Sequence, residues 1–401
     1  MRHVVELSYM YPSPRHPNSG VFIERTVREL ARRVALDVVS PVPWTPRPLG
    51  RLSARWGAYA RQPATSRCHG VPVHHPRYVQ PLGRWALAVS GLTMAAGARS
   101  TVARLVARTG ADVIHVHQLL PDGLAGVLLG ARFGCPVVCT LHGSDVTEAP
   151  NQAPFARAAA RFVARRARAF VAASRNLVDA LAAVAPDHAP AAVVPYGVDT
   201  DAFVPRDRAA VRRRLGIPAD RPLVVYAGLL IARKGVDVLL DGFGRLAARR
   251  PDVELVVVGG SDERDDRRGA LAARAARAGC RARVRFVGRR PHDEMPLWLA
   301  AGDVFAFPSR LEGSPNVVRE AVACGTPCVV SALPGIAEVV GPEQGIVVPI
   351  DDAAALADAL ARALARRWDP ATVRAPAAGW RWEDTAARTL AVLERARRDG
   401  A

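Results

Sequence analysis

The chain has 401 residues, of which 50% are hydrophobic and 23% charged; this describes a globular protein rather than a disordered or fibrous one, and the length favours two domains over one. Its 55 basic residues outnumber 37 acidic ones, so the net charge is +18. The six cysteines form no CxxC pair and no zinc spacing with histidine, which indicates free, mostly buried thiols in a reducing cytosol. The first residues lack the long apolar segment of a signal peptide, and the longest weakly polar run, 85–98, is too short to span a bilayer.

The positive charge has three explanations that the composition leaves open. The first is codon usage, because all but one of the 55 basic residues are arginine. The second is attraction to an anionic membrane surface or to a phosphate-bearing substrate. The third is nucleic-acid binding, but the sequence contains no RRM, zinc-finger or KH signature and no aromatic residues interleaved with the basic ones. We therefore expect no specific nucleic-acid partner.

The first half of the chain alternates short apolar runs with amphipathic segments. Residues 3–7 predict a strand, and residues 21–34 predict a helix because apolar side chains recur there at three- and four-residue spacing. Further strands are expected at 36–42, 112–117, 135–142, 169–174 and 191–197. These runs are almost continuously apolar instead of alternating, which is typical of a parallel sheet covered on both faces.

The second half repeats this pattern. Strands are expected at 222–228, 253–260, 284–288, 303–309, 326–331 and 345–349, with helices between them. A loop rich in Pro, Asp and Gly, 195–208, divides the two series. The sequence therefore predicts an α/β protein of two doubly wound domains, 1–197 and 198–379. The last helix, around Trp380 to Arg398, is expected to pack back onto the first domain, so that 380–401 belongs to it.

Polar residues stand where several of these strands end. They are His117, His142, Ser174, Gly259 with Gly260, and Ser309. Ligands of open parallel sheets bind outside the carboxyl ends of the strands. Two facing domains would direct all of these residues into one cleft.

The segment 309–331 carries the most specific pattern. Glu312 lies in a Gly/Ser/Pro loop, and Glu320 follows eight positions later in the next helix. The loop amides of Gly313, Ser314 and Asn316 would point outward at the helix N-terminus, where unpaired N–H groups bind hydroxyls or anions. Glu320, about one turn into the helix, would accept two sugar hydroxyls. The alternative is a surface helix with ordinary exposed glutamates.

This spacing resembles the E-x7-E motif of the retaining glycosyltransferases of family 4, which have the GT-B fold. The resemblance covers nearly the whole chain, since "DVIHVHQLLPDGLAG", "TLHGSD", "PYGVDTDAF", "YAGLLIARKG", "VVVGG" and "RFVGRRPHDEMPLWLAAGDVFAFPS" follow in the family's order. It implies two Rossmann-like domains facing across a cleft. The opening residues 13–30 resemble the bacterial enzymes that build exopolysaccharides and teichuronic-acid-type polymers.

The only lysine of the chain, Lys234, lies in the turn after the strand at 222–228. By the resemblance, a lysine at this position binds the phosphates of the donor nucleotide. The physics agrees, because a diphosphate needs cationic donors and the helix expected to begin near Gly235 adds its positive N-terminal end. Many members of the family have arginine directly after the strand's glycine, whereas here Leu229 follows Gly228. Arg233 would then supply the second cation.

Other candidate donor-binding residues follow from the resemblance. His142 resembles the active-site histidine near the donor sugar; as a neutral imidazole it would donate a hydrogen bond to a sugar hydroxyl or its phosphate, the alternative being a structural histidine. His115 and His117 share one face of their strand, and we expect a core-edge or acceptor-side position for both. The remaining donor-binding candidates are Gly20, Gly259, Gly288 and Arg289.

No metal or cofactor is expected. Asp199 and Asp201 form a DxD pattern, but they lie in the interdomain loop, where the resemblance implies a turn. Metal-independent transfer follows, because cationic side chains can neutralise a diphosphate leaving group. A phosphorylase of this fold would need a lysine for pyridoxal phosphate, and the only lysine lies in the phosphate turn.

The sequence thus predicts a cytoplasmic hexosyltransferase that moves a sugar, with retention, from a nucleotide-sugar donor to a glycan or polyprenyl-linked acceptor in surface-polysaccharide biosynthesis. His142 and Glu312 are the expected catalytic residues. Association with the inner face of the plasma membrane is expected from the arginine-rich first domain. Two alternatives stay open: a different nucleotide-sugar enzyme of this fold, such as an epimerase, and a basic membrane- or nucleic-acid-binding protein without catalysis.

Overall fold

The computed structural model describes residues 1–13, 19–46, 53–81, 86–260 and 267–399. The chain forms two compact units, Met1–Tyr196 with Trp382–Ala401 and Gly197–Arg381. The sequence placed the two boundaries after residues 197 and 379. Part of the opening segment that resembles polysaccharide enzymes, residues 14–18, lies outside the described residues.

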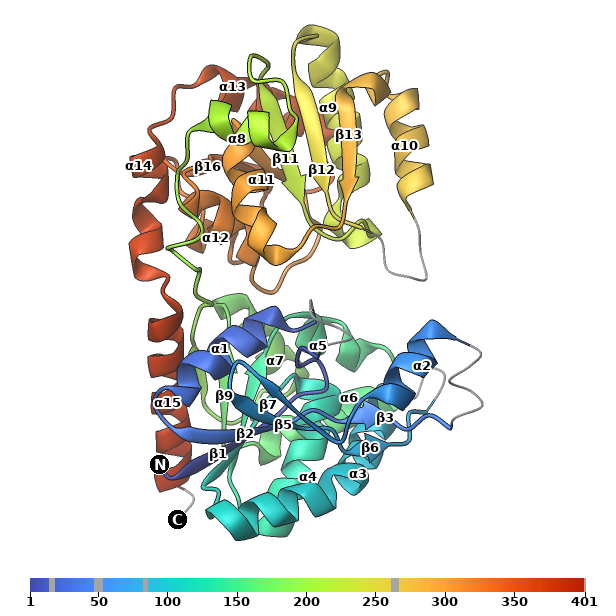
Figure 1. The fold of residues 1–401 in the computed structure, drawn as a ribbon, viewed down its shortest axis with the longest axis vertical. Helices are drawn as coiled ribbons and strands as arrows, with labels where there is room; N and C mark the ends of the chain where they lie inside the picture. The colour runs from blue at the N-terminus through green and yellow to red at the C-terminus, as the bar shows by residue number, and fades with distance from the viewer. Residues whose placement is uncertain (14–18, 47–52, 82–85, 261–266, 400–401) are drawn as a thin grey trace. The chain divides into compact units, whose positions relative to one another are not determined.

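The first unit is built on a sheet with the strand order β10-β9-β8-β7-β1-β2-β5-β4, in which only the β4–β5 pair is antiparallel (Figure 1). Its strands are β1 (His3–Leu7), β2 (Ala35–Val39), β4 (Thr65–Cys68), β5 (Val71–His74), β7 (Val113–His117), β8 (Val137–Leu141), β9 (Ala169–Ala172) and β10 (Ala191–Val193), beside a separate pair of β3 (Val42–Pro43) and β6 (Arg77–Tyr78). Its helices are α1 (Val21–Ala31), α2 (Ala54–Arg61), α3 (Ala86–Thr109), α4 (Leu124–Phe133), α5 (Ser144–Thr147), α6 (Pro154–Arg166), α7 (Arg175–Val184) and α15 (Trp382–Arg398).

The second unit contains a wholly parallel sheet with the order β13-β12-β11-β14-β15-β16. Its strands are β11 (Leu223–Ala227), β12 (Glu254–Val258), β13 (Val284–Gly288), β14 (Val304–Phe307), β15 (Cys328–Ser331) and β16 (Gly345–Val348). Its helices are α8 (Arg208–Leu215), α9 (Val236–Arg249), α10 (Arg268–Arg277), α11 (Met295–Ala301), α12 (Asn316–Ala323), α13 (Ala353–Ala365) and α14 (Pro370–Arg374).

Both faces of the first sheet are covered, as its continuous apolar strands predict. In β1, Val4 packs in a core cluster with α1 and α15, whereas Val5 and Leu7 pack in a second cluster with α3 and α4. Adjacent side chains of a strand point to opposite faces, so each strand needs apolar residues at nearly every position. The closing helix α15 packs against α1 within the first unit.

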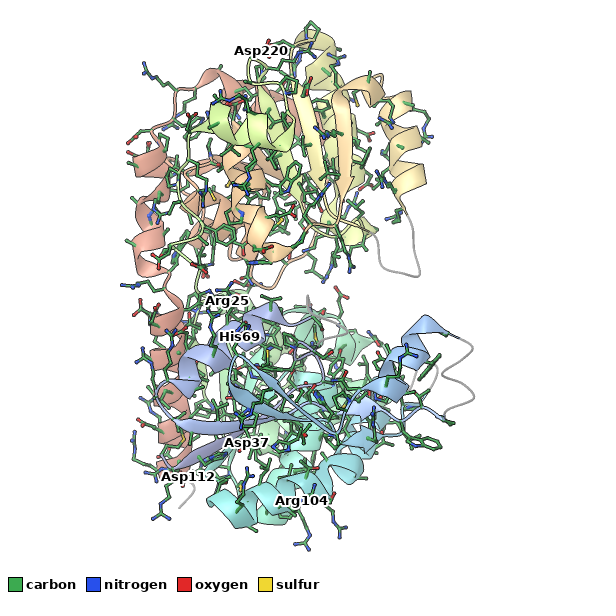
Figure 2. The ribbon with its side chains drawn as sticks, viewed as in Figure 1. Arg25, Asp37, His69, Arg104, Asp112 and Asp220 are labelled. Carbon is green, nitrogen blue, oxygen red and sulfur yellow. The ribbon has the colours of Figure 1, made fainter. Side chains whose placement is uncertain are left out.

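One buried carboxylate joins three strands of this sheet and a helix. Asp37 of β2, labelled in Figure 2, is 3% exposed. It lies 3.0 Å from His3 Nε2, 2.7 Å from His74 Nε2 and 3.1 Å from Arg108 Nη2. A buried charge requires such partners, so Asp37 serves the packing of β1, β2, β5 and α3.

One helix end differs from the prediction, and two helix starts lie close to the expected residues. The helix α1 ends at Ala31 instead of 34, because the amides of Arg33 and Val34 both donate to the carbonyl of Leu30 in a turn. The helix expected near Gly235 begins at Val236, and the last helix begins at Trp382. Among the described residues, none of the helices combines the length and apolarity needed to cross a membrane.

Candidate active site

Three glycines bring the carboxyl ends of β11, β12 and β13 together. The amide of Gly228 donates to Val258 O at 3.0 Å, and the amide of Gly259 donates to Gly288 O at 2.9 Å. A Cβ on Gly259 would overlap the carbonyl oxygen of Gly228, and all three glycines have positive φ. The predicted residues Gly259 and Gly288 therefore leave this edge of the sheet free of side chains at their positions, which permits close approach of a ligand to the backbone.

Lys234 lies in a short 3-10 helix, Ala232–Lys234, directly after β11. Gly235 follows with φ 63°, and a Cβ there would overlap the carbonyl oxygen of Pro308. The turn can thus be closed only by glycine. The turn places Lys234 at the carboxyl edge of the second sheet, and α9 begins directly after it.

The structure joins Lys234 to one of the two predicted glutamates. Lys234 Nζ lies 2.6 Å from Glu312 Oε1, and Ser309 Oγ donates to the same oxygen at 2.6 Å. The side chains of Lys234 and Glu312 are only 14% and 10% exposed. The sequence assigned these residues to different parts of a donor, the phosphates and the sugar, but they form one ion pair.

Arg310, between Ser309 and the motif loop, braces this arrangement. Its guanidinium binds both carboxylate oxygens of Asp237, at 2.9 and 2.8 Å, and Asp351 at 2.6 Å. Burial would raise the pKa of Asp237, but the hydrogen bonds and charge of Arg310 lower it. The amide of Arg310 also donates to Arg233 O at 2.8 Å, so the loop after β14 is fixed against the lysine turn.

The loop before α12 was predicted to offer three amides to a ligand, and this is wrong for Asn316. Its N–H donates to Ser314 O at 3.0 Å, because Pro315 tightens the turn. The side chains of the loop behave differently. Ser314 Oγ and Asn316 Oδ1 are buried and have no hydrogen-bond partner among the described residues. Buried polar atoms rarely lack partners, so these two are suited to a hydroxylated ligand.

Glu320 lies on α12 as predicted, but it has a partner that the sequence did not suggest. Its Oε1 is 3.1 Å from Nε2 of His292, in the 3-10 helix His292–Glu294. The His292 ring packs edge-on against Phe203 at 5.6 Å between centroids. This contact fixes the position of a carboxylate that is 15% exposed.

The remaining donor candidates of the second unit differ in position. Arg233 is part of the lysine turn, and its carbonyl accepts from Ser309 Oγ at 3.1 Å. Arg289 is exposed, with its aliphatic part over Gly260. Asp199 accepts from the amide of Ala202 at 3.1 Å, which is the hydrogen bond of a turn, as expected for this loop.

In the first unit, His142 follows β8 and is partly exposed. Both of its ring nitrogens have partners: Nε2 lies 3.3 Å from His117 Nδ1, and Nδ1 is hydrogen-bonded to the hydroxyl of Tyr196. The ring is 4.8 Å from that of Phe22 between centroids. Burial, followed by the charges of His117 and His115, lowers the pKa of His142 well below its ordinary value, so the imidazole is neutral as expected.

Gly20 caps α1 in the left-handed conformation, with φ 55°. A Cβ there would overlap the carbonyl oxygen of Met10. The structure thus gives Gly20 a packing reason, and its predicted contact with a diphosphate stays a prediction.

Sequence reasoning missed Glu6, His292 and Tyr196. Glu6 is a fully buried acid inside the apolar run "HVVEL", and that misplaced charge was a signal. The other two lie far along the chain from their partners, and only the fold brings them together.

The two Rossmann-like units and the strand-end groups define the class of protein: a glycosyltransferase with the GT-B fold. A model of the family described as "Glycosyltransferase Family 4" matches residues 20–202, and one described as "Glycosyl transferases group 1" matches residues 221–366. The chain belongs to glycosyltransferase family 4.

Similar proteins agree with this membership. A protein of Bacillus subtilis (strain 168) assigned to teichuronic acid biosynthesis as the glycosyltransferase TuaC is 28% identical over 90% of this chain and 88% of its own length. A D-inositol 3-phosphate glycosyltransferase of Xylanimonas cellulosilytica is 35% identical, with 71% and 72% covered. A GDP-mannose-dependent alpha-(1-6)-phosphatidylinositol monomannoside mannosyltransferase of Mycolicibacterium smegmatis is 30% identical, with 95% of both chains covered.

Solved structures show the same fold. Sucrose-phosphate synthase from Thermosynechococcus elongatus superposes with a TM-score of 0.79 at 22% identity, covering 98% of this chain and 99% of the other. HepE of Anabaena in complex with UDP-glucose gives a TM-score of 0.73 at 20% identity, covering 98% and 100%.

Proposed function

We propose that this glycosyltransferase transfers a sugar from a nucleotide-sugar donor, with retention, to a glycan or lipid-linked acceptor of a surface polysaccharide. The observation that carries the donor assignment is the Lys234–Glu312 pair at the carboxyl edge of the second sheet. Shortly after Glu312 in the chain come Ser314 Oγ and Asn316 Oδ1, which are buried and have no hydrogen-bond partner within the described part of the chain. A cation, a carboxylate and free hydroxyl- or amide-type acceptors together match a phosphorylated sugar.

The roles divide along the chain. Lys234, with Arg233, neutralises the departing diphosphate, a task that a metal ion performs in other transferases. Glu312 contacts the donor sugar, and Glu320 holds the ribose. In front-face transfer the bond from the anomeric carbon to the diphosphate breaks while the bond to the acceptor oxygen forms on the same face. The acceptor's proton passes to the leaving phosphate.

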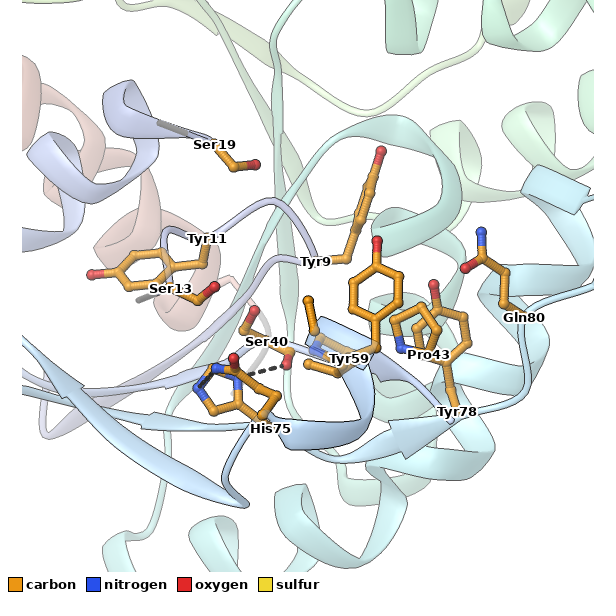
Figure 3. Close-up of a pocket in the computed structure, with 14 residues that line it drawn as sticks. Tyr9, Tyr11, Ser13, Ser19, Ser40, Pro43, Tyr59, His75, Tyr78 and Gln80 are labelled. Carbon is orange, nitrogen blue, oxygen red and sulfur yellow. Dashed lines mark hydrogen bonds between the residues drawn. The ribbon is translucent and has the colours of Figure 1, made fainter. Parts of the chain in front are cut away.

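The first unit contains a cavity of about 210 Å³ that suits the sugar of an acceptor (Figure 3). Its lining includes the side chains of Tyr9, Tyr59, Gln62, His75 and Gln80. Among the described residues that line it, none is Asp, Glu, Lys or Arg. Tyrosine faces with hydroxyl and amide groups bind the apolar face and the hydroxyls of a neutral ring.

A membrane-held acceptor is supported by helix α6. This helix buries a stripe of small residues and exposes Phe155 and Phe162, at 41% and 39%. Arginines 157, 161, 165 and 166 are exposed on the same helix. Aromatic residues among cations are typical of helices that lie in an anionic membrane interface.

Binding of nucleotide sugars tests the central proposal. UDP-, GDP- and ADP-sugars should be compared by thermal shift, because a ligand that binds the folded state raises the midpoint with its concentration. Nucleotide sugars of one base should raise the unfolding midpoint of the wild type, and they should not raise that of Lys234→Ala. Arg310→Lys, outside the pair, is a control for changes in the loop. If no nucleotide sugar shifts the midpoint, the donor assignment fails.

A further inference from the structure

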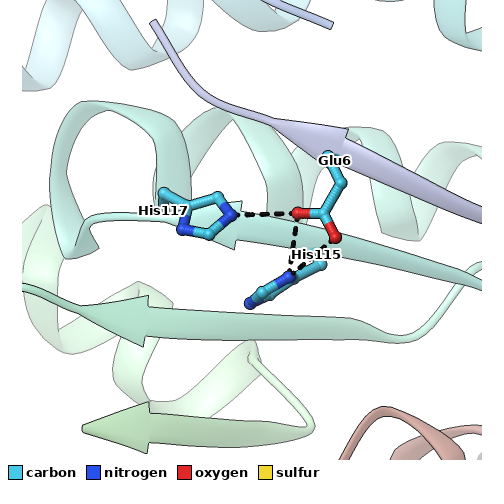
Figure 4. Close-up of side chains that lie close together, drawn as sticks. All are labelled: Glu6, His115 and His117. Atoms are coloured by element: carbon cyan, nitrogen blue, oxygen red, sulfur yellow. Dashed lines mark hydrogen bonds and ion pairs between the residues drawn. The ribbon is translucent and has the colours of Figure 1, made fainter. Parts of the chain in front are cut away.

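Glu6, His115 and His117 form a buried cluster on one face of the first sheet (Figure 4). The register places Glu6 beside His115 and places His117 beside Thr140. Glu6 and His115 are 0% exposed and His117 is 1% exposed. The mechanism proposed above does not use these groups, and a buried charge inside a strand needs a reason.

The cluster contains a carboxylate with two donors. Glu6 Oε2 lies 2.9 Å from His115 Nδ1 and 2.9 Å from His117 Nε2. Burial would raise the pKa of Glu6, but the charge and hydrogen bond of His115, then those of His117, lower it to about 2. His115 Nε2 is 2.7 Å from Thr140 Oγ1. Two histidine rings thus face one carboxylate that is buried within the sheet.

The position of each further proton follows from that carboxylate. His117 must donate to Glu6 through Nε2–H, and its pKa is lowered to about 4 by burial and by the charge of His115, so the ring is neutral. Its Nδ1 then carries a lone pair and accepts from His142 Nε2–H at 3.3 Å. The neutral His142 ring in turn has its lone pair on Nδ1, which accepts from the Tyr196 hydroxyl.

We infer that Glu6 is a positioning residue: through His117 it fixes the tautomer of His142, which therefore offers Nδ1 to substrate as a hydrogen-bond acceptor. A substrate hydroxyl can replace the Tyr196 hydroxyl at this nitrogen. A fully ionised phosphate cannot, because it has no proton to donate. The donor role that the sequence suggested for His142, toward a hydroxyl or phosphate, is thereby reversed. The contact with substrate rests on the proposed function, whereas the tautomer does not.

A metal ion is the competing account of the same cluster. One ligand atom each from Glu6, His115 and His117 lies within 4.8 Å of the others. The separations of 2.9 Å between carboxylate oxygen and ring nitrogens are those of hydrogen bonds. The same carboxylate oxygen faces both rings, which is the arrangement of an acceptor shared by two donors.

Long-range ¹H–¹⁵N NMR of protein labelled at histidine tests the inference, because it shows which ring nitrogen carries the proton. In the wild type, His117 and His142 should each appear as a single Nε2–H tautomer. Glu6→Met removes the acceptor, and both rings should then show mixed tautomers. Glu6→Gln keeps an acceptor oxygen and should restore the Nε2–H form of both. Glu29→Met, which removes another buried acid of the first unit, should leave both rings unchanged.

Three results would overturn the inference. They are an Nδ1–H tautomer of His142 in the wild type, an unchanged His142 in Glu6→Met, and binding of one zinc ion per chain by the cluster in a Zn²⁺ titration. If Glu6→Met fails to fold, Tyr196→Phe tests the inference instead. His142 should keep its Nε2–H tautomer in this variant, and a change to Nδ1–H would show that Tyr196, not Glu6, fixes the tautomer of His142. Transfer assays then separate the two proposals, since Glu6→Met should lower kcat more than it raises the donor KM. If neither the wild type nor any variant binds nucleotides, the proposed function is refuted, but the inference about the His142 tautomer is not.

Discussion

The Lys234–Glu312 pair leads to a prediction about nucleotide affinity that depends on both partners. If Lys234 binds the diphosphate as proposed, Lys234→Ala removes a charge-assisted hydrogen bond worth about 1.5–3 kcal/mol. At roughly 1.4 kcal/mol for each factor of ten, UDP or GDP should bind about 10- to 150-fold more weakly. Lys234→Ala also leaves the carboxylate of Glu312, only 10% exposed, without its cation and beside an anionic ligand.

Glu312→Gln should have the opposite effect on binding. It removes the charge that lies 2.6 Å from Nζ and leaves the lysine free to neutralise phosphate. The Gln variant should therefore bind the nucleoside diphosphate at least as tightly as the wild type, while transfer slows because, in the proposed function, Glu312 contacts the sugar. In the Glu312→Gln background, Lys234→Ala should weaken nucleotide binding less than in the wild type, because no carboxylate is then left without its cation beside the anionic ligand. Contacting charges typically show a coupling of about 0.5–3 kcal/mol.

Isothermal titration calorimetry of the wild type, both single variants and the double variant measures this cycle. Lys234→Arg, which keeps the charge but changes its shape, should recover part of the affinity. Thermal unfolding of each variant without ligand checks the fold. Equal effects of Lys234→Ala in the two backgrounds would show that the pair is not coupled, and an alanine variant with wild-type affinity would refute the phosphate assignment.

Three further predictions concern other parts of the molecule. Glu320→Ala should chiefly raise the donor KM, because a ribose contact persists unchanged through the reaction, whereas Glu312→Ala should lower kcat; equal small effects in steady-state kinetics would contradict both roles. The unfolding free energy should fall by roughly 3 kcal/mol or less as the pH drops from 6.5 to 4, because the pKa of His117 is lowered to about 4 in the folded protein and only the unfolded residue takes up a proton in this range. Denaturant titrations of the wild type and of His117→Gln should show that the unfolding free energy depends less steeply on pH in the variant. The protein should co-sediment with anionic but not with neutral vesicles and should be released as the salt concentration rises, because each basic residue near the surface contributes about 1 kcal/mol of attraction. The double variant Phe155→Ser with Phe162→Ser should bind the vesicles less. Equal behaviour toward both kinds of vesicle would leave codon usage as the explanation of the +18 charge.

The sequence by itself determined the fold class, the family and the positions of most donor candidates. Continuous Val and Ile runs can be buried only in a parallel sheet covered on both faces, and all such strands end at one edge. That rule placed Lys234, Ser309 and His142 at strand ends without any knowledge of their contacts. Gly235 was foreseeable too, because a turn between strand and helix favours a residue that accepts positive φ.

Only the tertiary structure decided which of these residues act together. Lys234 and Glu312 are 78 positions apart, and Glu6 and His117 are 111 apart. No local pattern records such pairings, because they depend on strand order and register. The direction of the hydrogen bonds from Glu6 to Tyr196 is a property of the whole chain of groups, since each neutral imidazole has one donor and one acceptor nitrogen. For that reason the sequence could identify His142 as a candidate, and the fold was needed to infer the direction of its hydrogen bonds.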